Sequence, residues 1–223
     1  MNTTLALLLL WLLFGITHSV PTSQGVRERL VARLGRGGYV GLYSLVSFAT
    51  FVPLVWVYVA NRHAGPLLWS LRNVSAVWWV AFALAGLGFT LTIFSFFQPS
   101  PFAMGAPSRL EPYGLTRITR HPLFMPVSWI AAGHLLLFGW ATDIAFFGGL
   151  AAYTVLGCAH QDRRRRASEG PRLEAFFAQS SLLPFAAIFT GRTRLVLEEL
   201  PWLGLAIGAG AAYGFFRLHP VMF

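Results

Sequence analysis

Long apolar runs alternate with short polar, arginine-bearing segments along the whole chain. Each of six such runs is close to the length of helix that crosses the hydrocarbon core of a bilayer. They are residues 4–20, 39–60, 74–97, 122–140, 144–159 and 201–218. The pattern therefore predicts an all-α, polytopic transmembrane helix bundle of about six spans, formed as a single domain over residues 1–223.

Residues 24–36 follow a different pattern, with Val26, Leu30 and Leu34 on one side and arginines between them. This spacing predicts a short amphipathic helix at the membrane interface. The first run, in contrast, opens with uncharged Met-Asn-Thr-Thr. A cleaved signal peptide would open with basic residues, so the first run is interpreted as a membrane-spanning helix.

The segments between the spans are expected to be irregular. Residues 98–120 carry four prolines and predict a polar loop, and residues 161–181 predict a second, basic loop. Residues 182–190 are too short to span and are expected to dip into the interface. The pair Thr142 and Asp143 predicts a tight turn at the outer surface. In the last span, Gly204, Gly208, Gly210 and Gly214 are spaced for close helix packing.

The composition agrees with a membrane protein, because 56% of the residues are hydrophobic and only 11% are charged. The net charge of +9 would suggest nucleic acid in a soluble chain. Here the arginines lie between apolar runs, where topology signals belong, and no nucleic-acid partner is expected. Cys158 is the one cysteine. A single thiol excludes an intrachain disulfide and a cysteine-based metal site, so Cys158 is interpreted as a packing residue.

The distribution of arginines predicts the orientation. Segments 21–38, 98–120 and 161–200 hold 14 of the 17 arginines and alternate with the spans so that they share one side. The positive-inside rule places that side in the cytoplasm. We therefore expect a protein of the cytoplasmic (inner) membrane with both termini in the periplasm.

Histidines at membrane depth are the first candidates for chemistry. His134 lies inside an apolar run, His18 ends the first span, His121 opens the fourth, and His160 closes the fifth. Neutral imidazole is a common axial ligand of haem iron, so His18 with either His134 or His121 is a candidate pair. The structural alternative is that each imidazole bonds to a neighbouring helix. The two remaining histidines, at positions 63 and 219, are interpreted as surface residues.

The string GLTRITRHPLF (114–124) is the most specific motif in the chain. Arg117 and Arg120 flank the start of the fourth span beside His121. Guanidinium groups there suit an anion such as a haem propionate or a lipid phosphate. The alternative is that both arginines are ordinary topology anchors, and the run from Arg163 to Arg166 favours that interpretation even more.

Several strings together resemble the NnrU family of membrane proteins, and most closely its 15-cis-zeta-carotene isomerase branch. They are TRITRHPLF, His134 thirteen residues after His121, the DRRR after the fifth span, and LLPFAAIFTGR (182–192). The stretches ITHS around His18, VYVANRHAGPLLW (57–69) and the closing LPWLGLAIGAGAAYGFFRLHP are similar as well. The resemblance covers essentially the whole chain.

This resemblance implies a haem b-dependent isomerase that acts on a lipophilic polyene within the bilayer, with membrane lipids around it and a redox partner. It implies that His18 and His134 are the axial, catalytic iron ligands, with His121, Arg117 and Arg120 near the cofactor. Ala131 stands where the family has an alternative cysteine ligand, and Tyr153 where it has a further histidine. Depth in the membrane favours His121 rather than His134 as the partner of His18, because His134 lies roughly 20 Å along its span from the end near His18.

Two other functions are compatible with these strings. Proteins of the NnrU family are associated with denitrification, and this resemblance would make the chain a non-catalytic accessory that binds haem or nitric oxide. Isoprenylcysteine-type methyltransferases carry a similar Arg-His-Pro. The methyltransferase is disfavoured because Asp162, rather than a glutamate, stands in the DRRR segment and no methyl-donor loop accompanies it.

Overall fold

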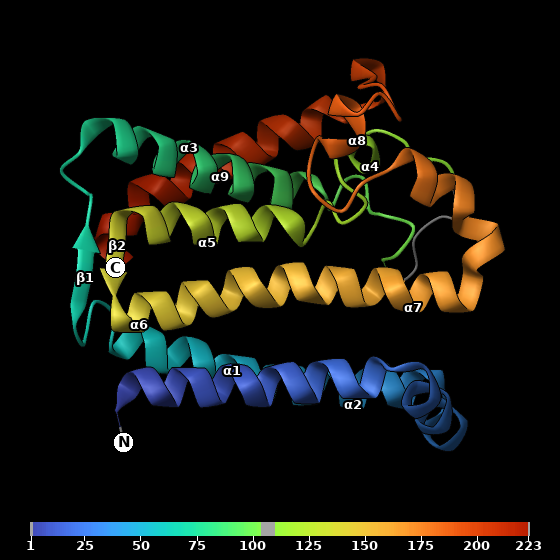
Figure 1. Cartoon of the computed structure of the whole chain (residues 1–223), viewed down its shortest axis with the longest axis horizontal. Helices are drawn as coiled ribbons and strands as arrows, with labels where there is room; N and C mark the ends of the chain where they lie inside the picture. The colour runs from blue at the N-terminus through green and yellow to red at the C-terminus, as the bar shows by residue number, and fades with distance from the viewer. Residues whose placement is uncertain (1, 104–109, 223) are drawn as a thin grey trace.

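Long helices lie roughly side by side in the computed structural model, which describes residues 2–103 and 110–222 (Figure 1). The long helices are α1 (Thr3–Ser19), α2 (Gln24–Ala60), α3 (Ser75–Phe94), α5 (Met125–Leu137), α7 (Gly149–Gln179) and α9 (Trp202–Met222). Short helical turns are η1 (Val20–Thr22), α4 (Leu115–Ile118), α6 (Ala141–Asp143), η2 (Ile144–Gly148), α8 (Ala186–Phe189) and η3 (Leu197–Glu199). α5 packs between α3 and α7, α3 also contacts α9, and α1 packs on α2.

Four helical stretches are long and apolar enough to cross a membrane. They are Thr3–Thr22, Gln24–Ala60, Ser75–Phe94 and Ala141–Gln179. Large apolar side chains such as Leu12, Phe48 and Trp56 are exposed on them, as expected for faces that contact lipid. The expected count of about six spans is not confirmed, because α5 is apolar but short and α9 is not among the four.

The amphipathic segment and the second span form one element, α2, with a break at Gly35. The φ of Gly35 is 70°, a conformation that side-chain-bearing residues rarely adopt. Gly35 thus lets the preceding part of α2, residues 24–34, take a different direction from the membrane-spanning part. We call residues 24–34 the basic arm.

The basic segment 161–181 is helical rather than a loop, so that prediction was wrong. α7 continues through it to Gln179, with a break in the helical backbone at Glu169. Arginine, alanine and glutamate are good helix formers, and this part of α7 also buries Phe176 and Phe177 against Phe102. Burial of this apolar side explains why a highly charged stretch stays helical.

The structure is mostly helical, as predicted, and contains in addition a short two-stranded ribbon. β1 (Leu67–Ser70) pairs antiparallel with β2 (Phe138–Trp140), with Leu67 opposite Trp140. The indole of Trp69 lies so close to Gly139 that a Cβ there would be 2.2 Å from the ring. The ribbon therefore depends on a glycine in β2, and it joins the α2–α3 connection to the end of α5.

Thr142 and Asp143 do not form an exposed turn. They lie in α6, which leads through the π-helical segment η2 directly into α7, and both side chains are buried. The glycines of α9 divide into two pairs. Gly204 and Gly208 lie against α3, as the spacing predicted, whereas Gly210 and Gly214 have open space beside them.

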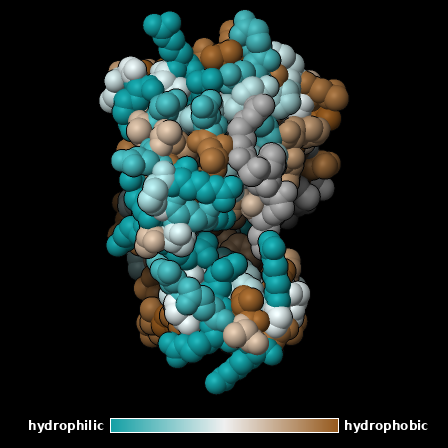
Figure 2. Space-filling view, turned by 90° about the vertical axis from the view of Figure 1, so that its right-hand side faces the viewer, coloured by the Kyte–Doolittle hydropathy of each residue, from teal (hydrophilic) through white to brown (hydrophobic). Residues whose placement is uncertain are grey.

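The two ends of the bundle differ in composition. α1 begins and α9 ends at the same end, next to the ribbon (Figure 1). The start of α2, α4, α8 and the break in α7 lie at the opposite end, where Figure 2 shows mostly hydrophilic residues. The three arginine-rich segments thus share one end, as the arginine count assumed; which compartment that end faces stays a prediction. We call it the Arg-rich end.

Candidate functional site

Aromatic side chains from α1, α2, η2 and α7 form one buried cluster in the bundle. We define the aromatic cluster as Trp11, Phe14, Phe51, Phe146, Phe147 and Tyr153. Trp11 stands at its centre, with ring centroids 5.9 Å from Tyr153 and 6.1 Å from Phe146. Its indole Nε1 is buried and has no hydrogen-bond partner among the described residues. Buried donors without a partner are rare in proteins, so this indole is an exception in the packed core.

His18 lies at one end of the aromatic cluster, stacked on Phe14 with ring centroids 5.0 Å apart. Ser47 Oγ donates to the Tyr43 carbonyl, so it must accept from His18 Nδ1, 2.9 Å away. The Tyr43 hydroxyl then donates to His18 Nε2. In the neutral imidazole the proton is therefore on Nδ1, and the lone pair of Nε2 accepts from the Tyr43 hydroxyl.

His134 lies at the other end of the aromatic cluster, stacked on Phe147 with ring centroids 4.2 Å apart. Its Nδ1 donates to the Ile130 carbonyl at 2.8 Å, which leaves the lone pair on Nε2. The His219 ring is 6.1 Å away. His219 thus contacts His134 and is half-buried, which corrects its interpretation as a surface residue.

The two imidazoles have different neighbours. His18 contacts Phe14, Tyr43, Ser47 and Tyr153, whereas His134 contacts Ile130, Phe147 and His219. His18 lies at the level of Tyr153 and His134 at the level of Phe147. Six residues of helix separate Tyr153 from Phe147, an offset of about 9 Å. The offset in depth is therefore about half of what the sequence suggested.

Both histidines fit an axial haem ligand in their donor chemistry. As neutral imidazoles, both hold the proton on Nδ1 through a hydrogen bond, the arrangement that metal-bound histidines use. His134 then presents Nε2 directly, whereas Nε2 of His18 accepts from Tyr43. Two changes would be needed for an iron to reach both. The Tyr43 hydroxyl would have to release His18. The rings of Trp11 and Phe146, which belong to the series of ring contacts that runs from His18 to His134, would have to make room.

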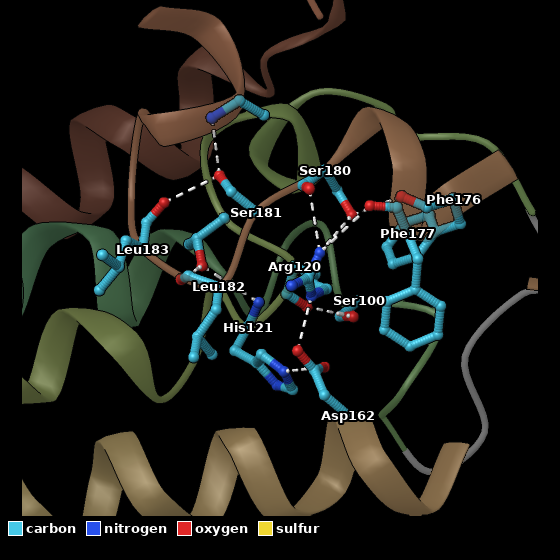
Figure 3. Close-up of polar contacts among 12 residues, drawn as sticks. Ser100, Arg120, His121, Asp162, Phe176, Phe177, Ser180, Ser181, Leu182 and Leu183 are labelled. Atoms are coloured by element: carbon cyan, nitrogen blue, oxygen red, sulfur yellow. Dashed lines mark hydrogen bonds and ion pairs between the residues drawn. The ribbon is translucent and has the colours of Figure 1, made fainter. Parts of the chain in front are cut away.

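A second polar group, at the start of α5, joins Arg120, His121 and Asp162 (Figure 3). Asp162 accepts from Arg120 Nε and from His121 Nε2, both at 2.8 Å. Arg120 Nη1 also donates to the Ser180 carbonyl at 2.9 Å, and Ser100 donates to the Arg120 carbonyl at 2.7 Å. All five residues are buried, so this network ties the loop after α3 and the end of α7 to α5.

Arg117 makes a two-pronged ion pair with Glu199 of η3. Its Nε and Nη2 donate to the two carboxylate oxygens at 2.6 and 2.7 Å, and its Nη1 donates to Thr193 at 3.1 Å. The hydrogen bonds to Glu199 raise the pKa of Arg117 above its ordinary value. The guanidinium groups of Arg117 and Arg120 thus already have carboxylate partners within the chain.

A third polar group lies at the end that carries the termini. Asp143 is almost fully buried and accepts from the Tyr58 hydroxyl at 3.0 Å and from His63 Nδ1 at 2.8 Å. His63 adopts a positive φ of 55° and also points its backbone N–H at Asp143. His63 was interpreted as a surface residue; its ring is partly exposed but is held by this carboxylate.

The remaining sequence candidates lie apart from these groups. Cys158 is buried, in agreement with a packing role. The Nε2 of His160 is buried without a hydrogen-bond partner in the described part of the chain. Within the same residues, no group of three or more histidine, cysteine or acidic side chains is arranged to hold a metal ion.

Comparison with known families identifies the chain. The family model described as "NnrU protein" matches residues 6–223. The chain belongs to the NnrU family. His18, His134 and the Arg120–Asp162 network all fall within the matched region of this NnrU protein, as do the strings that suggested the family.

Two relatives of this NnrU protein carry the same name. It is 30% identical over 236 residues to a protein of Arabidopsis thaliana named "15-cis-zeta-carotene isomerase, chloroplastic". It is 27% identical over 234 residues to the protein of that name from Zea mays. Each alignment covers 97% of this chain and 60% of the relative, so the chain spans somewhat less than two thirds of their length. No solved structure matches.

The sequence did not reveal the partners of the candidate residues. Tyr43 and Ser47, which fix the His18 ring, lie in an apolar run and carry no motif of their own. The carboxylates that pair with Arg117 and with His63 are likewise distant in the chain. One available signal was the four-residue spacing of Tyr43 and Ser47, which places them on one face of a helix.

Proposed function

We propose that this NnrU protein is a haem-dependent cis–trans isomerase of a lipophilic polyene, similar in reaction to the relatives named 15-cis-zeta-carotene isomerase. One observation carries the haem part of the proposal. His18 and His134 lie at the two ends of the aromatic cluster, and both carry the lone pair on Nε2. Neutral imidazole is a donor that haem iron takes through Nε2, and at His18 the iron would replace the Tyr43 hydroxyl there.

His18 and His134 are the proposed iron ligands and, through the iron, the catalytic residues. The Ile130 carbonyl and Ser47 fix the ring orientations, and such hydrogen bonds also make an imidazole more basic toward a metal. When bound, haem b would supply a redox-active iron that can lower the order of a polyene double bond. Ala131 stands at the alternative cysteine position and offers no thiolate, so these two histidines act without a ligand exchange there.

The aromatic cluster supplies the surroundings that such a reaction needs. Its rings are flat and apolar, and they can stack against a conjugated chain while they exclude water. Isomerisation about one double bond forms and breaks no σ bond, so the protein has no proton to deliver to the substrate. The cluster's task in this proposal is to hold the polyene beside the iron while the bond rotates.

Arg117, Arg120 and His121 take a different place in the proposal. A propionate would have to displace Glu199 from Arg117, or Asp162 from Arg120 and His121. Propionate binding by these residues stays a prediction. Their observed contacts support a structural task, in which they hold the loop before α5 against η3 and α7.

The proposed setting is a membrane. The four apolar helices support a substrate dissolved in the bilayer, and a redox partner would set the iron's oxidation state. The cytoplasmic membrane and the periplasmic termini remain part of this proposal, since they rest on the arginine count.

Two measurements on the purified, detergent-solubilised protein test the proposal. An optical spectrum should show a sharp Soret band with α and β bands after reduction. Incubation with 15-cis-zeta-carotene, followed by chromatographic separation of the isomers, should show loss of the 15-cis form in the reduced sample. Absence of haem after reconstitution would overturn the cofactor. Stable haem without isomerisation would favour the non-catalytic accessory instead.

A further inference from the structure

Arg27 and Arg164 are two of the arginines at the Arg-rich end that have no acidic partner among the described residues. Arg27 lies in the basic arm at the start of α2, and Arg164 lies in α7. Neither takes part in an ion pair with a described residue. The Nε of Arg164 is buried and has no hydrogen-bond partner in that same set. A buried guanidinium nitrogen without an acceptor is costly, so an acceptor from outside the chain would be favourable there.

Arg27 and Arg164 both lie near Tyr39. Arg27 stands over the ring of Tyr39, 5.8 Å from its centroid. The charges that act on Arg164 include those of Arg27 and Arg165, together with the phenols of Tyr39 and Tyr43. Arg165 pairs with Glu169, whereas neither Arg27 nor Arg164 pairs with a described carboxylate. Burial and the neighbouring charges, that of Arg27 among them, lower the pKa of Arg164. Like charges held together in this way favour a bound anion.

An apolar cavity of about 80 Å³ adjoins this cationic pair. Tyr39 and Tyr43 form part of its wall, and the rest is mostly aliphatic: Thr17, Pro21, Leu30, Leu42 and Val46. The cavity therefore lies where the basic arm meets the first two spans, next to the arginines. Its size suits a short stretch of hydrocarbon chain rather than a whole ligand.

We propose that Arg27 and Arg164 bind the phosphate group of an anionic phospholipid, whose acyl chain begins in the cavity lined by Tyr39, Tyr43 and Val46. Charge complementarity selects the head group, because basic pockets between membrane helices take anionic lipid phosphates. The apolar wall selects a lipid over a free phosphate ion. Gly35 positions the arm, since the turn it permits brings Arg27 back over Tyr39.

Lipid binding by the purified full-length protein tests this proposal without reference to isomerase activity. Native mass spectrometry would follow titration with phosphatidylglycerol and with phosphatidylcholine of the same acyl chains. The wild type should retain phosphatidylglycerol preferentially. The double variant R27Q/R164Q should bind it on the order of tenfold more weakly, because two cationic contacts are lost. The control R33Q/R163Q removes the same charge from the same two helices and should change the affinity by less than about twofold.

The remaining outcomes separate the two parts of the site. Val46→Phe fills the cavity and should weaken long-chain phosphatidylglycerol more than a short-chain form, while the protein elutes as the same single species. Unchanged binding in R27Q/R164Q, or an equal loss in the control, would overturn the site. Displacement of the lipid by millimolar inorganic phosphate would overturn the lipid assignment, because the ion alone would then suffice.

Discussion

The indole of Trp11 lies directly against the backbone of Gly149. A Cβ built on Gly149 would stand 2.3 Å from Trp11 Nε1 and 2.4 Å from its Cδ1, closer than real Cβ contacts ever come. The first turn of α7 thus has no room for a side chain where Trp11 packs. The position of the aromatic cluster depends on this contact, because Trp11 touches four of its other rings.

Gly149→Ala is therefore expected to lower the free energy of unfolding by about 1–3 kcal/mol, the usual effect of an extra methyl group in a packed core. Thermal unfolding in detergent would measure it. Gly148→Ala is the matched control, since a Cβ there meets nothing within 4 Å and alanine favours a helix. Equal stability of the two variants would show that Trp11 can move without cost.

His18→Ala and His134→Ala are each expected to remove the low-spin, six-coordinate haem spectrum and to leave either no haem or a five-coordinate species. His121→Ala should keep the low-spin bands, because His121 bonds to Asp162 rather than to the aromatic cluster. The opposite pattern would assign the iron to His121. A thiolate-type ferric spectrum would implicate Cys158 and contradict the two-histidine assignment.

Tyr43→Phe tests whether His18 is an iron ligand by a change that leaves the histidine itself in place. The Tyr43 hydroxyl occupies His18 Nε2, so its removal should tighten haem binding roughly three- to tenfold, the worth of one hydrogen bond. Haem titration monitored at the Soret band gives the affinity. Weaker binding in Tyr43→Phe would mean that Nε2 of His18 is not the ligand atom.

Asp162→Asn should destabilise the protein by about 3–5 kcal/mol, because it leaves the buried Arg120 charge without its counter-charge. The matched control is Glu169→Gln, which breaks the more exposed Arg165–Glu169 pair of the same helix. That change should cost less than about 1 kcal/mol. Similar unfolding temperatures for the two variants would contradict the structural role of the Arg120–Asp162 network.

Arg117→Gln, Glu199→Gln and the double variant form a double-mutant cycle. The two-pronged geometry and partial burial of this pair predict a coupling of about 1–2 kcal/mol in thermal stability. Haem retention should be the same in both single variants if the pair is purely structural. A loss of haem in Arg117→Gln alone would instead assign this guanidinium to a propionate.

The apolar runs were predictable from the sequence because lipid-facing helices must keep their surfaces apolar, a property of each segment by itself. The helical structure of the Arg-rich segment of α7 was not predictable, because arginine is both a good helix former and the residue that marks cytoplasmic loops. Only burial of Phe176 and Phe177 decides for the helix. The strands β1 and β2 were not predictable, because three or four residues are too few to show the two-residue alternation of a strand.

The site was predictable to a smaller extent. A histidine in an apolar run is visible in one sequence, and His18 and His134 became candidates in that way. Their surroundings depend on pairings across long stretches of chain, such as Tyr58 with Asp143, 85 residues apart. Such pairings follow from how helices pack, which no local pattern encodes.

The β1–β2 ribbon and the buried Asp143 affect how a small molecule could enter the helix bundle. Both lie at the end that carries the termini. The ribbon pairs the α2–α3 connection with the end of α5, and the bonds from Tyr58 and His63 to Asp143 hold the loop after α2 against α6. A water-soluble molecule would have to break these bonds to approach His134 along the helix axes. A lipophilic molecule could instead enter laterally from the bilayer, between neighbouring helices, without breaking these bonds. The route to the aromatic cluster would then itself select for compounds that dissolve in lipid.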